Sequence, residues 1–190
     1  MRNVEHSRAT KETQISVKLN LDGAGTTDIS TGIAFFDHLL RTLGVHSRID
    51  LVIDGKGDLR HHIVEDVGIT LGEAFRKALG DSRGIHRFGY AVIPMDDALA
   101  LAAVDLATRP YTKIDLKIVG DTIEDTTSED ILHFLESFAL SLRANIHILV
   151  EYGNNDHHKV ESAFKALALS LRQAVSSTGS GEIPSAKGTI

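Results

Sequence analysis

The chain of 190 residues is long enough for one large domain or for two small ones that share a core. Its formal net charge of −6 argues against a nucleic-acid-binding protein, which would present a basic stripe. The sequence contains no cysteine, so disulfides and thiolate metal sites are excluded. Any metal site must therefore use histidine nitrogen and carboxylate oxygen.

The apolar segments of the chain are short. The longest uninterrupted run, Ala98 to Val104, has seven residues, far too few to cross a membrane. The first ten residues lack the apolar region of a signal peptide. We therefore expect no contact with membranes and a cytoplasmic location. Histidine is the unusual residue, because ten histidines cluster in a chain that has three tyrosines and no tryptophan.

The first part of the chain shows two strand patterns and two helix patterns. Alternating apolar and polar residues from Ile15 to Leu21 indicate a strand. A helical pattern starts near His38, and the pattern from Ile49 to Ile53 indicates a second strand. After a glycine turn, a second helical pattern starts at His61.

The second part of the chain repeats this order. Ile114, Leu116 and Ile118 indicate a strand, and a helical pattern starts near His133. The next strand pattern begins at Ile146, and the next helix pattern begins at His157. Residues 37–79 and 133–175 match with only a small gap, since the histidines that begin the two helices are 23 positions apart in the first copy and 24 in the second. This agreement indicates an internal repeat.

The repeat predicts an α+β fold with two similar halves, residues 1–93 and 94–190. We expect each half to form a β-sheet with two helices packed on one face, and the halves to be related by a pseudo-twofold axis. About 95 residues with helices on one sheet face leave an apolar layer that needs a partner, so neither half should fold alone. The halves should therefore form one compact unit.

Each half contains the pattern His-His-x-x-Glu. The first histidine and the glutamate are four positions apart, which places them on one helix face, about 40° apart. The second histidine points about 100° away, so one motif supplies a pair of ligands and a histidine directed elsewhere. A single motif of this kind is usually a solvated helix face, but two copies at equivalent positions of a repeat favour metal ligation.

We expect the second histidine of each motif to complete the ligand pair of the other motif. One ion would bind His61, Glu65 and His158. The other would bind His157, Glu161 and His62. The natural fourth ligands are His38 and His133, which are equivalent in the repeat. Four nitrogen and oxygen ligands leave two positions of an octahedron for substrate, which suits Mn²⁺ or a similar divalent ion acting as a Lewis acid.

Further motifs occur in order from about Glu5 to the C-terminus. They are Arg8-x-Thr10-x-Glu12-Thr13, Phe36–Leu40, His61–Asp66, Arg87-Phe88-Gly89, Asp96, Arg109-Pro110-Tyr111, His133-Phe134, His157–Ala166 and Ile183–Gly188. Motifs this numerous and in this order are highly specific. Together they resemble the imidazoleglycerol-phosphate dehydratase family.

The resemblance implies an enzyme that removes water from D-erythro-imidazoleglycerol phosphate to give imidazoleacetol phosphate, a step of histidine biosynthesis. Members of this family use Mn²⁺, here implying two ions per subunit. They assemble into a hollow shell of twenty-four subunits with active sites at subunit contacts, so the resemblance implies a homo-oligomer. The family's metal ligands fall on the eight residues named above. Its phosphate contacts fall on Arg87, Arg109, Lys165, Ser185 and Lys187.

Three carboxylates are expected to take part in catalysis: Glu12, Glu65 and Glu161. Glu12 is the candidate for substrate contact and proton transfer, with hydroxide held by a metal ion as the alternative. The Ser/Gly-rich run from Ser176 suggests a tail that folds over bound substrate and carries Lys187 with it. Two other functions stay open at this point. One is a two-metal phosphoesterase, which should carry more aspartate ligands, and the other is a metal-binding shell protein without activity.

Overall fold

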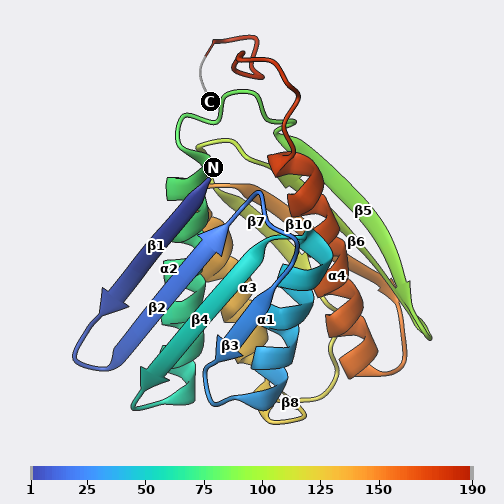
Figure 1. Ribbon diagram of the computed structural model, residues 1–190. Coiled ribbons are helices and arrows are strands. Elements are labelled where there is room, and N and C mark those ends of the chain that lie inside the picture. Colours follow the sequence, from blue (N-terminus) through green and yellow to red (C-terminus); the bar gives the residue numbers. More distant parts are fainter. Residues whose placement is uncertain (1, 189–190) are drawn as a thin grey trace.

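Two four-stranded sheets flank four helices in the computed structural model, which describes residues 2–188 (Figure 1). The elements of the first half are β1 Asn3–Ala9, β2 Thr13–Asn20, β3 Thr27–Ser30, α1 Ala34–Ser47, β4 Asp50–Gly57 and α2 Arg60–Leu79. Those of the second half are β5 Phe88–Met95, β6 Ala98–Asp105, β7 Tyr111–Asp115, β8 Thr122–Ile123, β9 Thr126–Thr127, α3 Ser128–Leu142, β10 Asn145–Tyr152 and α4 Asp156–Val175.

The two sheets have the same topology, which confirms the predicted repeat. Their strand orders are β1-β2-β4-β3 and β5-β6-β10-β7. In each sheet the second and third strands of this order pair antiparallel, and the fourth strand joins parallel to the third. The fold is therefore α+β, with two similar halves and two long helices in each half, as expected.

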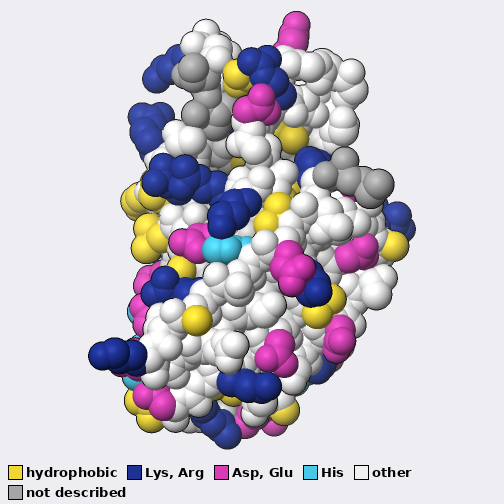
Figure 2. Space-filling model, turned by 60° about the vertical axis from the view of Figure 1, so that its left-hand side comes forward, with side chains coloured by type: hydrophobic (Ala, Val, Ile, Leu, Met, Phe, Trp, Pro, Cys, Tyr) yellow, Lys and Arg dark blue, Asp and Glu magenta, His cyan; other side chains and the backbone are white. Residues whose placement is uncertain are grey.

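The helices lie on one face of each sheet. Helices α1 and α2 pack on the first sheet, and α3 and α4 pack on the second. The alternation predicted for β2 places Ile15, Val17 and Leu19 in the core, where each is almost fully buried. The face of the molecule turned forward in Figure 2, on the β1 side, shows Lys, Arg, Asp and Glu side chains interspersed, with hydrophobic side chains in small separate groups. Most apolar side chains of the first sheet thus face the helices, and Val52 of β4 is an exposed exception.

The two halves meet through their helices. Helix α2 packs against α3, and α1 packs against α4. Gly68 and Gly72 of α2 allow the first of these contacts to be close, because a Cβ on Gly72 would lie only 2.6 Å from the carbonyl oxygen of Phe138. Each helix that carries a His-His-x-x-Glu motif consequently faces the first helix of the other half.

Three local features differ from the expectations. Strand β5 pairs with β6 along its whole length, so the second sheet begins upstream of the expected boundary at residues 93 and 94. Strand β7 ends at Asp115, although the alternation continues to Ile118; Lys117 has a positive φ of 50°, which interrupts an extended chain. A short hairpin, β8–β9, forms before α3, although the polar composition of residues 120–125 predicts a loop there. Among residues 2–188, no helix has both the length and the apolarity to span a membrane.

Candidate metal centres and phosphate pocket

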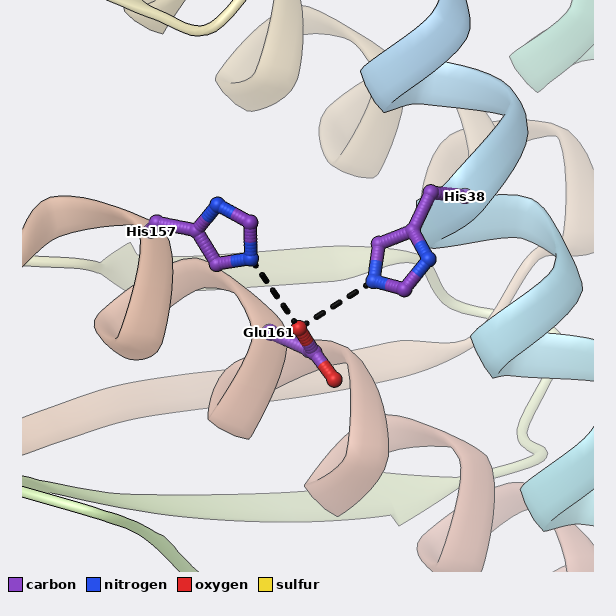
Figure 3. A group of neighbouring side chains, drawn as sticks. All are labelled: His38, His157 and Glu161. Carbon is purple, nitrogen blue, oxygen red and sulfur yellow. Dashed lines mark hydrogen bonds and ion pairs between the residues drawn. The ribbon is translucent and has the colours of Figure 1, made fainter.

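The first candidate metal centre, here called the His38 group, consists of His38, His157 and Glu161. His157 and Glu161 are one turn apart on α4, and His38 reaches them from α1 (Figure 3). Glu161 Oε2 lies 3.1 Å from His38 Nε2 and 3.2 Å from His157 Nε2. The side chain of Asn155 caps α4 by accepting the backbone N–H of His157 at 2.8 Å, which fixes the start of the motif helix. These three residues line a cavity of about 590 Å³.

The second candidate centre, the His61 group, consists of His61, Glu65 and His133. His61 and Glu65 lie one turn apart on α2, and His133 comes from α3. One donor atom from each residue lies within 4.8 Å of the others, as in the His38 group. The rings of His61 and His133 have centroids 4.9 Å apart. Each group therefore takes its helical pair from one half and its third residue from the other.

The donor atoms of the His61 group fit a divalent metal ion. Among residues 2–188, one buried side-chain nitrogen or oxygen atom has no hydrogen-bond partner, and it is His133 Nε2. It lies 3.4 Å from Glu65 Oε1 without making a hydrogen bond to it. A buried polar atom left unpaired costs free energy, and coordination of a cation would satisfy it. Two imidazole nitrogens and a carboxylate oxygen are ligands that suit first-row divalent ions.

All four motif histidines present Nδ1 to a carboxylate. The partners of Nδ1 are Asp130 for His61, Asp58 for His62, Glu124 for His157 and Asp97 for His158, at distances between 2.6 and 3.1 Å. A carboxylate on one ring nitrogen orients a histidine and leaves the other nitrogen for a metal ion. The second histidine of each motif therefore has its ring oriented by a carboxylate, as the first does, although its Nε2 faces another direction.

His62 and His158 belong to neither group within one chain. His62 contacts Asp58, and its Nδ1 lies 3.9 Å from Oε2 of Glu12, a residue of the β1–β2 turn. His158 contacts Asp97 and Asp96 in the β5–β6 turn. The helical geometry explains this arrangement, because the second histidine points about 100° away from the first. The expected sets that combine His158 with His61, and His62 with His157, are therefore not brought together by a single chain.

Charged neighbours shift several pKa values at these sites. Burial alone would raise the pKa of Glu161, but hydrogen bonds from Lys165 and His38 outweigh it and lower the pKa to about 2. The hydrogen bond with Asp58 raises the pKa of His62 and lowers that of Asp58. The hydrogen bond with His158 is the largest cause of the lowered pKa of Asp97. Glu161 is thus ionised at neutral pH, as a metal ligand must be.

Four of the five expected phosphate contacts line one cavity of about 440 Å³: Arg87, Arg109, Ser185 and Lys187. Arg87 is held there by Asp105, with Nε 2.7 Å from Oδ1, and donates from Nη1 to the carbonyl oxygen of Pro184. The fifth expected contact, Lys165, lies elsewhere, with Nζ 2.9 Å from Glu161 Oε1. A single chain therefore offers a cationic pocket at its tail and a separate lysine at the His38 group.

The tail is bound to the segment that precedes β5. Thr178 N–H donates to the carbonyl oxygen of Gly84, and Gly84 N–H donates to that of Glu182, both at 2.8 Å. Ile85 forms an isolated bridge with Ser177. These contacts carry the chain from α4 back to Arg87, which is how Ser185 and Lys187 reach the pocket.

Sequence reasoning missed the carboxylates that support the histidines. Asp58 lies four positions before its partner His62, so an acidic residue one turn before a motif histidine was a usable signal. Asp130 is 69 positions from its partner His61. Glu124 is 33 positions from its partner, and no local pattern identifies it. Asp125, beside it, was missed too, although it caps α1 by accepting the N–H groups of Ala34 and Phe35.

Comparisons with known proteins agree with this architecture. A family model described as imidazoleglycerol-phosphate dehydratase matches residues 31–171. The protein of that name from Methanothermobacter thermautotrophicus is 49% identical over 193 residues, covering 100% of this chain and 98% of the relative. A protein of the same name from Phytophthora nicotianae is also 49% identical, but the chain spans 43% of its length. A crystal structure of the enzyme from Pyrococcus furiosus in complex with (S)-C348 is 39% identical, with a TM-score of 0.85 over 97% of this chain and 99% of that one.

Proposed function

The chain belongs to the imidazoleglycerol-phosphate dehydratase family, and on this premise we propose that it removes water from D-erythro-imidazoleglycerol phosphate with the help of two divalent metal ions. The products would be imidazoleacetol phosphate and water. As a member of this family, the chain is a hydro-lyase of histidine biosynthesis.

The observation that carries the proposal is the pair of three-residue groups. Each group joins two imidazoles and one carboxylate within 4.8 Å, and in the His61 group a buried nitrogen has no hydrogen-bond partner. We propose that each group holds one ion and that the ion is Mn²⁺. Ions in these positions would supply Lewis-acid stabilisation of the negative charge that develops on the substrate. Glu65 and Glu161 would hold them in place.

We propose that a neighbouring chain supplies the remaining ligand of each ion. His62 and His158 are oriented by carboxylates, as ligands are, yet lie outside both groups of their own chain. A second copy of the chain would place His158 at the His61 group and His62 at the His38 group. The outer side of β5 exposes Phe88, Tyr90 and Val92, and an exposed apolar row of this kind supports association. The proposed assembly is a homo-oligomer, the shell of twenty-four subunits implied by the resemblance.

The chain's other polar residues have distinct proposed roles. Arg87, Arg109, Ser185 and Lys187 would bind the substrate phosphate, because three cations and a hydroxyl converge on one pocket. Lys165 would join them from another chain. Glu12 lies beside His62, so a contact that brings His62 to a metal ion also brings an exposed carboxylate to the substrate. We propose that Glu12 moves the proton at the reacting carbons.

An assay on metal-stripped protein tests the proposal. The protein is treated with a chelator, dialysed, and incubated with imidazoleglycerol phosphate with and without added Mn²⁺. We expect the ketone product with Mn²⁺ and at most a trace without it. Release of inorganic phosphate would instead identify a two-metal phosphoesterase. Uptake of Mn²⁺ without either product would identify a metal-binding protein without this activity.

A further inference from the structure

The two metal groups contain the same ligand types but differ in the charge beside them. In the repeat, His38 corresponds to His133, and the pair on α4 corresponds to the pair on α2. Positions at equal distances from these residues can therefore be compared directly. Two such positions carry different residues in the two halves, and both bear on how strongly a cation binds.

The first position lies four residues after the motif glutamate. In the His38 group it is Lys165, whose Nζ lies 2.9 Å from Glu161 Oε1. In the His61 group it is Ile69, which brings no charge to Glu65. The ammonium group occupies one oxygen of Glu161 and neutralises part of its charge. The other oxygen is the one that faces His38 and His157 (Figure 3).

The second position lies three residues before the histidine contributed by the other half. In the His61 group it is Asp130, whose side chain is 10% exposed and whose Oδ1 lies 2.7 Å from His61 Nδ1. In the His38 group it is Phe35, whose ring packs against His157 with centroids 4.8 Å apart. The carboxylate at His157 Nδ1 is instead Glu124, at 3.1 Å and 60% exposed. A buried carboxylate orients its histidine and raises its basicity more effectively than an exposed one.

We propose that the two metal sites are unequal, and that the His61 group binds a divalent cation more tightly and is filled first. It offers two negative charges, Glu65 and Asp130, and within residues 2–188 neither carboxylate contacts a lysine or an arginine. The His38 group offers Glu161, which Lys165 partly neutralises, and Glu124, which is exposed to solvent. In addition, His133 Nε2 has no hydrogen bond to give up on binding, whereas Glu161 must exchange two contacts. The expected difference in Kd is about 10-fold or more.

This inference rests on the proposed two-metal function, and one experiment separates the two. Metal-stripped protein is crystallised with one equivalent of Mn²⁺ per chain, and anomalous scattering is measured at the manganese edge. We expect a strong peak at the His61 group and a weak one at the His38 group. Equal peaks, or a stronger peak at the His38 group, would overturn the inequality and leave the two-metal function standing. No peak at either group, even with excess Mn²⁺, would overturn both.

Two variants test the cause. Binding of Mn²⁺ to the metal-stripped protein is followed by the electron paramagnetic resonance signal of the free ion, which does not depend on turnover. Lys165→Met should tighten the weaker site and bring the two Kd values together. Asp130→Asn should weaken the tighter site by about 10–100-fold.

Glu124→Gln, which changes the exposed partner of His157, is the matched control and should alter the weaker site by less than Asp130→Asn alters the tighter one. The metal-free Asp130→Asn and Lys165→Met variants should have the same melting temperature as the metal-free parent protein. A change in Kd then cannot be attributed to unfolding. If neither Lys165→Met nor Asp130→Asn changed the ratio of the two Kd values, the charges beside the groups would not set the inequality, and the proposal would be wrong.

Discussion

The His38 group and the His61 group contain the same three ligand types, but the rest of the chain supports them differently. The His61 group lies where α2 and α3 approach closely at Gly68 and Gly72. Its supporting carboxylate, Asp130, belongs to α3, the helix that also carries His133. The His38 group lies between α1 and α4, and takes its support from residues just before α3, Glu124 and Asp125.

A duplicated metal motif therefore need not produce two equal sites. The repeat fixes the spacing of the ligands along each helix and the face on which they lie. It does not fix the neighbouring positions, where a phenylalanine in one half stands for an aspartate in the other. The contacts between halves therefore decide the electrostatics of each site, because each group takes residues from both halves.

The largest effect is expected from removing one histidine from each group. His133→Ala and His38→Ala should each lose one of two bound ions and lower kcat/KM by at least ~100-fold, since loss of an outer-shell partner alone costs 10–100-fold. Elemental analysis and steady-state kinetics measure both effects. His6 belongs to neither group, so His6→Asn is the control and should keep both ions. A full complement of two ions in either alanine variant would show that the groups are not the metal sites.

The next effect concerns the phosphate pocket, which is separate from both groups in one chain. Deletion of residues 183–190 removes Ser185 and Lys187 from the pocket but no metal ligand. Because a hydrogen bond to a charged group contributes about 1.5–3 kcal/mol, KM for the phosphorylated substrate should rise by roughly 10-fold or more. Metal content should stay unchanged. An equal loss with a substrate analogue that lacks the phosphate would contradict the assignment of the pocket.

A smaller effect is expected from closing the gap between α2 and α3. In Gly72→Ala the new methyl group would meet the backbone of α3, so the helices must separate and the free energy of unfolding should fall by about 1–3 kcal/mol. The shift should also lower metal occupancy at the His61 group more than at the His38 group. Thermal unfolding and anomalous scattering measure the two effects. Gly181→Ala is the control, because a Cβ there meets nothing within 4 Å.

The smallest effect is a difference between the caps of α1 and α3 in their dependence on pH. Asp125 caps α1, whereas α3 is capped by the hydroxyl of Thr127, which does not titrate. Burial raises the pKa of Asp125, but the N–H groups of Phe35 and Ala34 outweigh it, and the pKa falls below the ordinary 3.8. A lowered carboxyl pKa means that this stabilisation is present above pH 3.8 and is lost as the pH falls below it.

Asp125→Ala should therefore destabilise the metal-free protein by about 1 kcal/mol near neutral pH, and by progressively less below pH 3.8. Thr127→Ala should cost a similar amount at every pH. Chemical denaturation across this range measures both variants. The same cost for Asp125→Ala at low and neutral pH would contradict the assigned pKa shift.

Local patterns were sufficient to predict the main features of the fold. The alternation from Ile15 to Leu21 and the helical spacing after His61 and His157 depend on neighbouring residues, and the corresponding elements form where expected. The equivalence of the halves follows from the repeated order of these elements. The early end of β7 was not visible, because the apolar alternation continues past it and only the left-handed conformation of Lys117 ends the strand.

The site was predictable where its residues belong to a motif and not where distant segments meet. The eight proposed ligands were named from the repeat and from the resemblance to the family. His38 joins the pair on α4 through a helix contact that spans more than a hundred residues of the chain. His133 joins the pair on α2 through a helix contact that spans about seventy residues. The placement of Lys165 beside Glu161 follows from helical spacing, but its effect on the metal site requires the comparison with Ile69.

Complementation between two inactive variants tests whether each metal site is built by two chains. His133→Ala chains and His158→Ala chains, each expected to be inactive, are co-expressed with different affinity tags, and particles that carry both tags are isolated. A site needs His133 from one chain and His158 from its neighbour, so random mixing should restore about a quarter of the sites. We predict activity of that order in the mixed particles. Mixed particles as inactive as either variant alone would contradict the shared site.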